Sequence, residues 1–188
     1  MRVLNFDEFK LDREVIIDSI IRGTVFIHPT DTIYGIGCNA QNSNSVKKIR
    51  KLKERTTNPF SVIAPSFEWI KENCIITKEA EEWLQKLPGP FTLIFKLKKN
   101  CVVKEVNLGL KTLGIRIPNH WIKTIVAEAN VPIVSTSVNK SNEDYMTSLE
   151  DLDPQIKAGL EFALYEGKKD VKPSKIIDLT GIVKIIER

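Results

Sequence analysis

The sequence predicts one α/β domain, residues 1–188, built on a twisted sheet of mixed parallel and antiparallel strands that is flanked by helices. Helical and strand patterns alternate along most of the chain, which is typical of parallel strands joined by helices. Near the end, strands at 161–165, 175–179 and 183–187 follow one another without helices long enough to separate them all, which indicates antiparallel pairing as well. A chain of 188 residues is one domain of ordinary size, and no linker or internal repeat divides it.

The helices are predicted from apolar spacing and from residues that start and stop helices. Segment 12–22 begins at the cap Asp12 and ends before Gly23. Segment 45–55 places its apolar residues on one side and its basic residues on the other. The other expected helices are 77–87, which Pro88-Gly89-Pro90 closes, one after Asn119 with Ile122, Ile125 and Val126 inward, and one from Ser148.

Strands are predicted where short apolar runs lie between turn residues. Before the three near the end, the expected strands are 24–28, 60–64, 91–97, 113–117 and 132–137. Sheets of α/β proteins usually bind ligands at the ends of their strands. Polar segments that follow a strand are therefore the first candidates for a site.

Composition excludes several kinds of protein. The apolar content is 42%, and no segment approaches the roughly 18 uninterrupted apolar residues of a membrane span. The first residues lack the apolar run of a secretory signal, so the cytoplasm is the expected location. The net charge of +4 is a mild excess that suits anionic small molecules as well as nucleic acid.

Histidine and cysteine are too few and too scattered for a metal site. His28 and His120 are expected to be structural, the first as a polar strand end and the second as a helix-start residue. Cys38, Cys74 and Cys101 have no C-x-x-C spacing and are expected as buried thiols. The sequence therefore predicts neither a zinc site nor a disulfide framework, and it nearly excludes a His triad.

Three polar segments are candidates for chemistry, and each has a plain structural alternative. Segment 28–37 (HPTDTIYGIG) brings hydroxyls, a carboxylate and glycines to a strand end, and is otherwise a polar turn. Segment 53–59 (KERTTNP) offers a point charge, a bidentate fork and neutral donors to a polyphosphate, and is otherwise a solvated helix end. Segment 135–141 (STSVNKS) is rich in hydrogen-bonding side chains, and is otherwise a turn. The common P-loop and G-x-G-x-x-G nucleotide motifs are absent.

In order and residue type, these segments resemble motifs of the YrdC family, the threonylcarbamoyl-AMP synthases of tRNA modification. HPTDTIYGIG is similar to the family's PTDTxYGLG, LKERTTNPFSVI to its KxR segment, and STSVNKS to its TSAN-x-S motif. PGPFTLIF, LGIRIPNH and PSKIIDLTG are similar to three further family elements. The resemblance implies a YrdC-like fold with a concave cationic cleft. The chain stops where the shorter members stop, so the extra C-terminal domain of the longer members is not expected.

The resemblance also implies a reaction, in which L-threonine, bicarbonate and ATP give threonylcarbamoyl-AMP and pyrophosphate. The activated group would then pass to an adenosine of certain tRNAs with the help of downstream tRNA-modification proteins. No covalent nucleophile is expected, and Mg²⁺ is expected to arrive with ATP rather than in a protein-held site. The residues implied for threonine are Thr32, Arg116, Ser135 and Ser174. The residues implied for ATP are Lys53, Arg55, Asn58, Thr112, Ser137, Asn139 and Arg188.

The chain departs from the family motifs at several positions, and two alternatives stay open. The departing residues are Thr56 for Pro, Ile63 for a threonine-contacting His of some members, Val138 for Ala, Asn142 for Gly and Tyr145 for Ser. They leave room for a paralogue with a different acyl or amino-acid substrate. The other alternative is a non-catalytic RNA-binding module, because one expected helix has a basic face that also suggests a weak tRNA contact. That face consists of Lys47, Lys48, Arg50 and Lys51.

Overall fold

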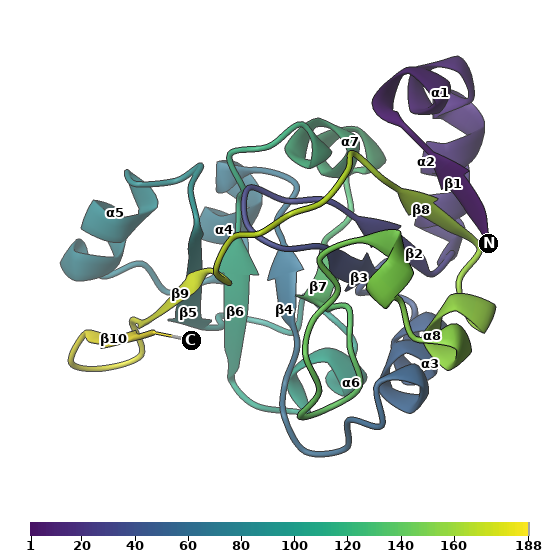
Figure 1. The fold of residues 1–188 in the computed structure, drawn as a ribbon. Helices are drawn as coiled ribbons and strands as arrows, with labels where there is room; N and C mark the ends of the chain where they lie inside the picture. Colours follow the sequence, from purple (N-terminus) through teal and green to yellow (C-terminus); the bar gives the residue numbers. More distant parts are fainter. Residues whose placement is uncertain (188) are drawn as a thin grey trace.

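A computed structural model of the chain describes residues 1–187, and in them the predicted α/β architecture with a mixed sheet is confirmed (Figure 1). The ten strands follow the order β1-β8-β2-β3-β7-β4-β6-β5-β9-β10 across the sheet. They are β1 (Arg2–Leu4), β2 (Phe26–His28), β3 (Gly35–Gly37), β4 (Ser61–Ile63), β5 (Phe91–Lys96), β6 (Thr112–Arg116), β7 (Ile133–Ser137), β8 (Phe162–Leu164), β9 (Lys175–Asp178) and β10 (Lys184–Ile186). The β1/β8, β2/β8, β4/β6 and β5/β9 pairs are parallel, and the remaining pairs are antiparallel.

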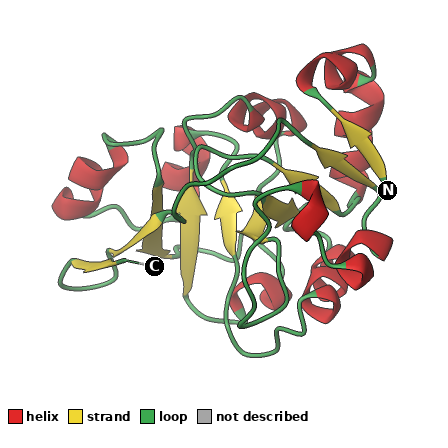
Figure 2. Cartoon of the chain, viewed as in Figure 1, coloured by secondary structure: helices red, strands yellow, loops and turns green. Residues whose placement is uncertain are grey.

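Helices surround the strands, as Figure 2 shows. They are α1 (Phe6–Leu11), α2 (Arg13–Arg22), α3 (Ser43–Leu52), α4 (Phe67–Asn73), α5 (Lys78–Leu84), α6 (Lys104–Asn107), α7 (Ile122–Ala129) and α8 (Pro154–Ala158), with a 3-10 turn η1 (Leu149–Asp151). Capping explains several starts, because side chains of Asn42, Ser66 and Thr77 accept backbone N–H bonds at α3, α4 and α5. The end of α2 is set by Gly23, whose φ of 102° is left-handed.

Two of the expected helices differ from the observed ones in their boundaries. The helix expected from Ser148 is only the short turn η1, and α8 begins at Pro154 because Asp153 caps it and proline fits the first helical position. The basic helix expected to reach residue 55 ends at Leu52, because Glu54 has a left-handed φ of 51°.

The expected cap of α2 also differs from the observed contacts. Asp12 occupies the cap position but makes no capping hydrogen bond, and its carboxylate lies 2.6 Å from Arg2 instead. Strand β3 lies in segment 28–37, for which no strand was predicted after residue 28. Its Gly-Ile-Gly sequence carries little strand signal, and it becomes a strand because β2 and β7 pair with it on either side.

The apolar core is divided between the two faces of the sheet, because successive side chains of a strand point to opposite faces. On β2, Phe26 joins a cluster with α1, α2 and α7, whereas Ile27 joins a larger cluster with α3 to α6 and α8. On β7, Ile133 and Val134 divide in the same way. The three helices α1, α2 and α7 thus cover one part of their face, and the remainder of that face is available for a site.

Strand β2 ends in a histidine that is a core residue rather than the expected polar strand end. His28 is 0% exposed. Its ring lies against Gly35, where a Cβ atom would come within 2.7 Å of the imidazole Cε1. The ring Nδ1 lies 3.2 Å from the carbonyl oxygen of Pro29. Burial lowers the pKa of His28 from 6.5 to about 4, so the ring is neutral at physiological pH.

His28 should therefore make the protein sensitive to acid. The unfolded histidine binds a proton near pH 6.5 and the folded one only near pH 4, so the free energy of unfolding falls as the pH is lowered through this window. The full difference corresponds to about 3 kcal/mol. In His28→Phe the ring cannot take up a proton, and this part of the pH dependence should vanish. Urea unfolding of the wild type and of His28→Phe, at neutral pH and near pH 4, measures this difference. If both proteins lose the same free energy of unfolding between the two pH values, the prediction is contradicted.

Candidate functional site

The cleft lies on the part of the sheet face that α1, α2 and α7 leave open, and small residues make its floor. Gly35, Ser135, Ser61 and Gly114 come from four adjacent strands. Ser61 is paired in register with both Ser135 and Gly114. A Cβ atom on Gly114 would lie 3.2 Å from Cγ2 of Thr92, so glycine keeps the floor low. The resulting cleft has a volume of about 300 Å³, which is within the range of small-molecule sites.

One end of the cleft collects polar groups around Arg55. The residues Arg55, Asn58, Thr112 and Ser137, all predicted as ATP contacts, line it. Pro59 precedes β4 by two residues, and the strand register therefore places it level with Thr112 and Ser137. Arg55 belongs to this end because its Nη2 donates to the carbonyl oxygen of Pro59 at 2.9 Å. The two neutral hydroxyls and the cation thus face the same part of the cleft.

The other end is organised by a buried ion pair. Nη2 of Arg116 lies 2.9 Å from Oδ1 of Asp31 and 3.0 Å from Oγ1 of Thr32. Only 6% of the Arg116 side chain and 11% of the Asp31 side chain are exposed. The second carboxylate oxygen of Asp31 accepts the backbone N–H of Asn119 at 2.8 Å. Thr32 and Arg116 were predicted as threonine contacts, and Asp31, which pairs with Arg116, was not singled out.

A pair of hydroxyls completes the Arg116 end. Oγ1 of Thr92 and Oγ of Ser174 lie 2.8 Å apart, and both residues line the cleft. The β5/β6 register places Thr92 level with Arg116. Ser174 was predicted as a threonine contact, and Thr92 was missed, although it is the hydroxyl residue of the otherwise apolar run FTLIF.

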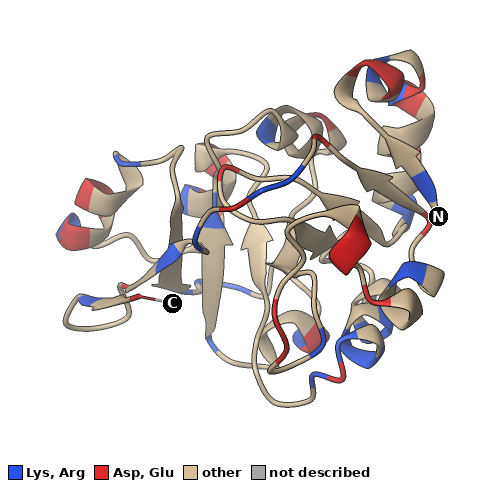
Figure 3. Cartoon of the chain, viewed as in Figure 1, with Lys and Arg blue, Asp and Glu red and all other residues tan. Residues whose placement is uncertain are grey.

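The predicted residues that line the cleft are spread along it. Arg55, Asn58, Thr112 and Ser137 lie at one end, and Arg116 and Ser174 lie at the other. Thr112 and Arg116 are four residues apart on β6, which separates them by about 13 Å along the strand. Ser135 lies between them, level with Ser61 and Gly114. The cleft has an arginine at each end, and the charge of Arg116 is offset by its ion pair with Asp31. Figure 3 shows where the other charged residues lie on the ribbon.

Two residues predicted as ATP contacts, Lys53 and Asn139, do not line the cleft. The ammonium of Lys53 donates to the carbonyl oxygens of Ser137 and Asn139 at 2.6 and 2.7 Å, and to Oδ1 of Asn139 at 2.9 Å. Ser141 returns two hydrogen bonds, from its N and Oγ to the Lys53 carbonyl oxygen. Burial and the nearby charge of Arg55 lower the pKa of Lys53 to about 7. Lys53 therefore fixes the loop that carries Ser137, and its contact with ATP stays a prediction.

Arg188, predicted as the last ATP contact, lies outside the described residues. The cysteines are buried as expected, and burial raises the pKa of each thiol. Over residues 1–187, no group of three or more His, Cys, Asp or Glu side chains is arranged to hold a metal ion. In the same residues, no helix has the length and apolar character needed to span a membrane.

None of the five residues that depart from the family motifs is among those that line the cleft. Val138 is buried in the larger core cluster, and Ile63 is buried in the smaller one. Asn142 has a φ of 69°, a left-handed conformation in which asparagine is the best tolerated residue after glycine. Asparagine is therefore well tolerated at this backbone position. Tyr145 is half-buried, and its hydroxyl lies 3.5 Å from the Val171 carbonyl oxygen.

Comparison with known sequences gives the family. Residues 18–188 match the Sua5_yciO_yrdC family, which carries the description telomere recombination. A Methanocaldococcus jannaschii protein provisionally named a threonylcarbamoyl-AMP synthase is 33% identical to this chain over 183 residues. The match covers 94% of this chain and 84% of the Methanocaldococcus protein. The threonylcarbamoyl-AMP synthase of Pyrococcus abyssi is 32% identical over 169 residues, which cover 86% of this chain. The match covers 48% of that protein, so this chain spans about half of its length.

Solved structures agree with this assignment. Sua5 of Pyrococcus abyssi in complex with L-threonine has a TM-score of 0.84 at 28% identity, and the match covers 96% of this chain and 54% of that one. YciO of Escherichia coli has the same TM-score of 0.84 at 21% identity, and the match covers 100% of this chain and 94% of YciO. At this identity the likeness supports the fold alone. The resemblance found in the motifs is thus confirmed, and the chain belongs to the Sua5/YciO/YrdC family.

Proposed function

We propose that the chain synthesises threonylcarbamoyl-AMP from L-threonine, bicarbonate and ATP and releases pyrophosphate. The observation that carries the proposal is the presence of residues predicted for ATP and for threonine at opposite ends of one cleft. Arg116 and its hydroxyl neighbours stand at one end, and Arg55 with amide and hydroxyl groups stands at the other. Such a cleft suits two anionic substrates that must meet between its ends. Relatives at 34% and 32% identity bear the name of this activity.

Arg116 is proposed to bind the carboxylate of the amino acid. A guanidinium presents a planar fork that matches a carboxylate, and the contacts with Asp31 and Thr32 fix its orientation before substrate arrives. The hydroxyls of Ser135 and Ser174 can both donate and accept, as the amine and the side-chain hydroxyl of threonine require. The complex of Pyrococcus abyssi Sua5 with L-threonine supports an amino-acid site in this fold.

Arg55 is proposed to bind the triphosphate, with Asn58, Thr112 and Ser137 as neutral partners. A cation that lies beside neutral donors in a partly enclosed cleft is a common arrangement for phosphate oxygens. Mg²⁺ is proposed to enter with ATP, because it prefers phosphate oxygens and retains much of its water. Lys53 would then support the site from behind, through the loop that carries Ser137.

The proposed chemistry needs positioning more than it needs a reactive side chain. The amine of threonine and bicarbonate form a carbamate with loss of water, and one oxygen of the carbamate attacks the α-phosphorus of ATP. The bond from the α-phosphorus to the bridging oxygen breaks, and pyrophosphate leaves with the electron pair. The cleft would gather these anions and offset the charge that develops on oxygen, which is a major contribution to such transfers. No protein nucleophile takes part.

The product is proposed to serve threonylcarbamoyladenosine formation on tRNA, in the cytoplasm and with other proteins that complete the transfer. A weak tRNA contact of the basic face on α3 belongs to the same proposal. Two cations of that face already have acidic partners, because Lys47 lies 3.5 Å from Glu105 and Lys48 lies 2.9 Å from Glu161. Arg50 donates mainly to backbone carbonyl groups. Because these cations already have partners within the protein, the face gives more support to the proposed enzyme than to the alternative of a dedicated RNA-binding module.

Release of pyrophosphate should require threonine and bicarbonate together, because the nucleophile is the carbamate that they form. The purified protein is incubated with Mg²⁺ and ATP, and pyrophosphate and adenylate mass are measured with each component omitted in turn. A panel of other amino acids in place of threonine tests the alternative of a paralogue. Release that continues without bicarbonate, or that prefers another amino acid, would reject the proposed reaction.

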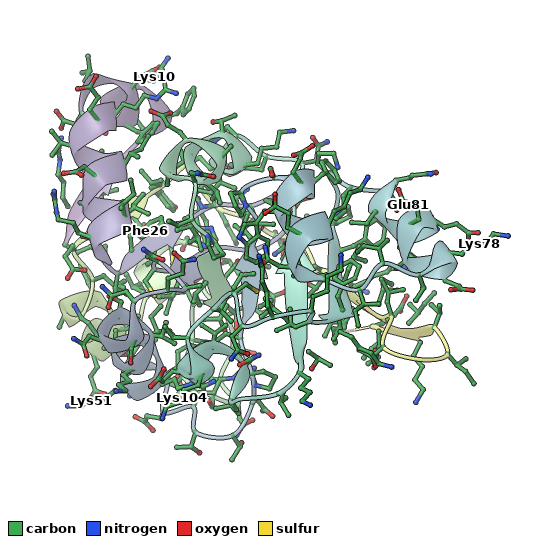
Figure 4. The ribbon with its side chains drawn as sticks, turned by 180° about the vertical axis from the view of Figure 1, so that it is seen from behind. Lys10, Phe26, Lys51, Lys78, Glu81 and Lys104 are labelled. Atoms are coloured by element: carbon green, nitrogen blue, oxygen red, sulfur yellow. The ribbon has the colours of Figure 1, made fainter. Side chains whose placement is uncertain are left out.

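Arg55→Ala should impair the use of ATP. Loss of a charge-assisted contact costs about 1.5–3 kcal/mol, so kcat/KM for ATP should fall roughly ten- to over a hundredfold while the KM for threonine changes little. Lys51→Ala is the matched control, because it removes one positive charge near the end of α3 from an exposed side chain that lies at the periphery in Figure 4. If the two substitutions impair the use of ATP equally, Arg55 contributes only to the overall positive charge of the protein.

Arg116→Lys should impair the use of threonine. Lysine keeps a positive charge beside Asp31 but lacks the planar fork, so the half-saturating threonine concentration should rise roughly tenfold or more. The KM for ATP should change less than about twofold. Arg13→Lys is the control, because it makes the same exchange in the surface pair with Glu128. Unchanged threonine kinetics in Arg116→Lys would remove Arg116 from the amino-acid site.

A further inference from the structure

The connection between β8 and β9, residues 165–174, crosses the open face of the sheet and forms one wall of the cleft. We name it the strap. Six other strands stand between β8 and β9 in the sheet, and Figure 1 shows the strap running in front of them. Its last two residues, Pro173 and Ser174, line the cleft. The strap thus carries the Ser174 hydroxyl that meets Thr92 at the Arg116 end, and the pairing of β9 with β5 holds this end of the strap.

The start of the strap is held by the carboxylate of Glu166. Its two oxygens lie 3.0 and 3.1 Å from Nε2 of His120. Oε2 also accepts the indole N–H of Trp121 at 2.9 Å, and Oε1 lies 2.5 Å from the ammonium of Lys169. A surface carboxylate with one partner contributes little to stability, whereas this one joins three side chains from two segments of the chain. His120 and Trp121 belong to the segment that leads into α7, and Lys169 belongs to the strap itself.

The backbone of Glu166 is tied to the cleft as well. Its N–H donates to the hydroxyl oxygen of Tyr34 at 3.0 Å, and that hydroxyl donates to the carbonyl oxygen of Gly167 at 2.6 Å. Tyr34 lines the cleft. Burial raises the pKa of Tyr34 to about 12, so the phenol remains a donor at physiological pH. Glu166 is thus the point where the strap, the cleft wall at Tyr34 and the segment before α7 meet.

The same segment connects Glu166 to the Arg116 end of the cleft. Asp31, which pairs with Arg116, accepts the backbone N–H of Asn119, and His120 follows directly in the chain. The strap is also held farther along, where the N–H of Lys169 donates to the Thr147 carbonyl oxygen at 2.9 Å. The start of the strap is therefore connected to both groups at the Arg116 end. It is linked to the guanidinium through the segment before α7 and Asp31, and to the Ser174 hydroxyl through the strap itself.

We propose that Glu166 is a positioning residue for amino-acid binding, which it favours by holding the strap closed against the cleft. The proposal rests on the proposed function, because it concerns the amino-acid end of that site. If the strap must be closed for binding, the apparent affinity equals the intrinsic affinity multiplied by the closed fraction. Loosening the start of the strap should then weaken amino-acid binding without direct contact between Glu166 and the substrate.

Glu166→Ala tests the proposal, and Glu166→Gln is the milder variant that keeps an acceptor oxygen for Trp121 if the first fails to fold. Glu128→Ala is the control, because Glu128 lies on α7, is 34% exposed against 28% for Glu166, and pairs with Arg13 away from the cleft. Hydrogen exchange of residues 167–174 is measured by mass spectrometry without substrates. L-Threonine binding is measured by calorimetry, and the KM values for threonine and ATP are measured by pyrophosphate release.

In the Glu166 variants we expect faster exchange of the strap, threonine affinity lower by about tenfold or more, and a KM for ATP within about twofold of the wild type. Unchanged exchange overturns the proposal whatever the substrate is. Faster exchange with unchanged threonine affinity, or an equal rise in both KM values, overturns it too and leaves Glu166 a purely structural residue. If the wild-type protein binds another amino acid in place of threonine, the proposed function fails by itself, and that amino acid replaces threonine in the same comparison.

Discussion

The ion pair between Arg116 and Asp31 is the interaction on which the cleft depends. Removing both charges from water is costly, and only good geometry with every remaining hydrogen-bonding group engaged offsets that cost. Asp31 meets the requirement by using one oxygen for Arg116 and the other for the N–H of Asn119, while Thr32 shares the guanidinium. The pair thereby joins the loop after β2, the end of β6 and the segment before α7. Whatever binds between these three segments meets groups that are already oriented.

The remainder of the site follows from an asymmetry of the sheet. One face is packed by helices α3 to α6 and α8, but on the opposite face α1, α2 and α7 cover only the part that includes β2 and the start of β7. The strands continue past these helices with Gly35, Ser61, Gly114 and Ser135, which are too small to fill the space. A cleft remains because the sequence places no bulky side chain there. Since its length follows β6, its two ends are far enough apart for two charged substrates.

Much of this arrangement could be predicted from the sequence, because capping residues, apolar spacing and motif order are local signals. The assignment of cleft residues to ATP and to threonine rests on the family resemblance and stays a prediction. Thr92 and Asp31 were missed because their roles depend on partners 82 and 85 residues away, Ser174 and Arg116. His28 was misplaced because nothing in the sequence shows that two glycines on the next strand make room for its ring. Glu166 carries no local signal, since an acidic residue beside glycine is typical of any exposed loop.

Lys53 is the lysine that the family motif predicts, but in the folded chain its ammonium contacts the loop that carries Ser137. Three oxygen acceptors surround its ammonium, which is the number of donors that a protonated lysine offers. Burial and the charge of Arg55 nevertheless lower its pKa to about 7, so the proton is held only weakly at neutral pH. The three acceptor oxygens oppose that effect, because they stabilise the charged ammonium, and the same hydrogen bonds hold the loop that carries Ser137 at the Arg55 end of the cleft.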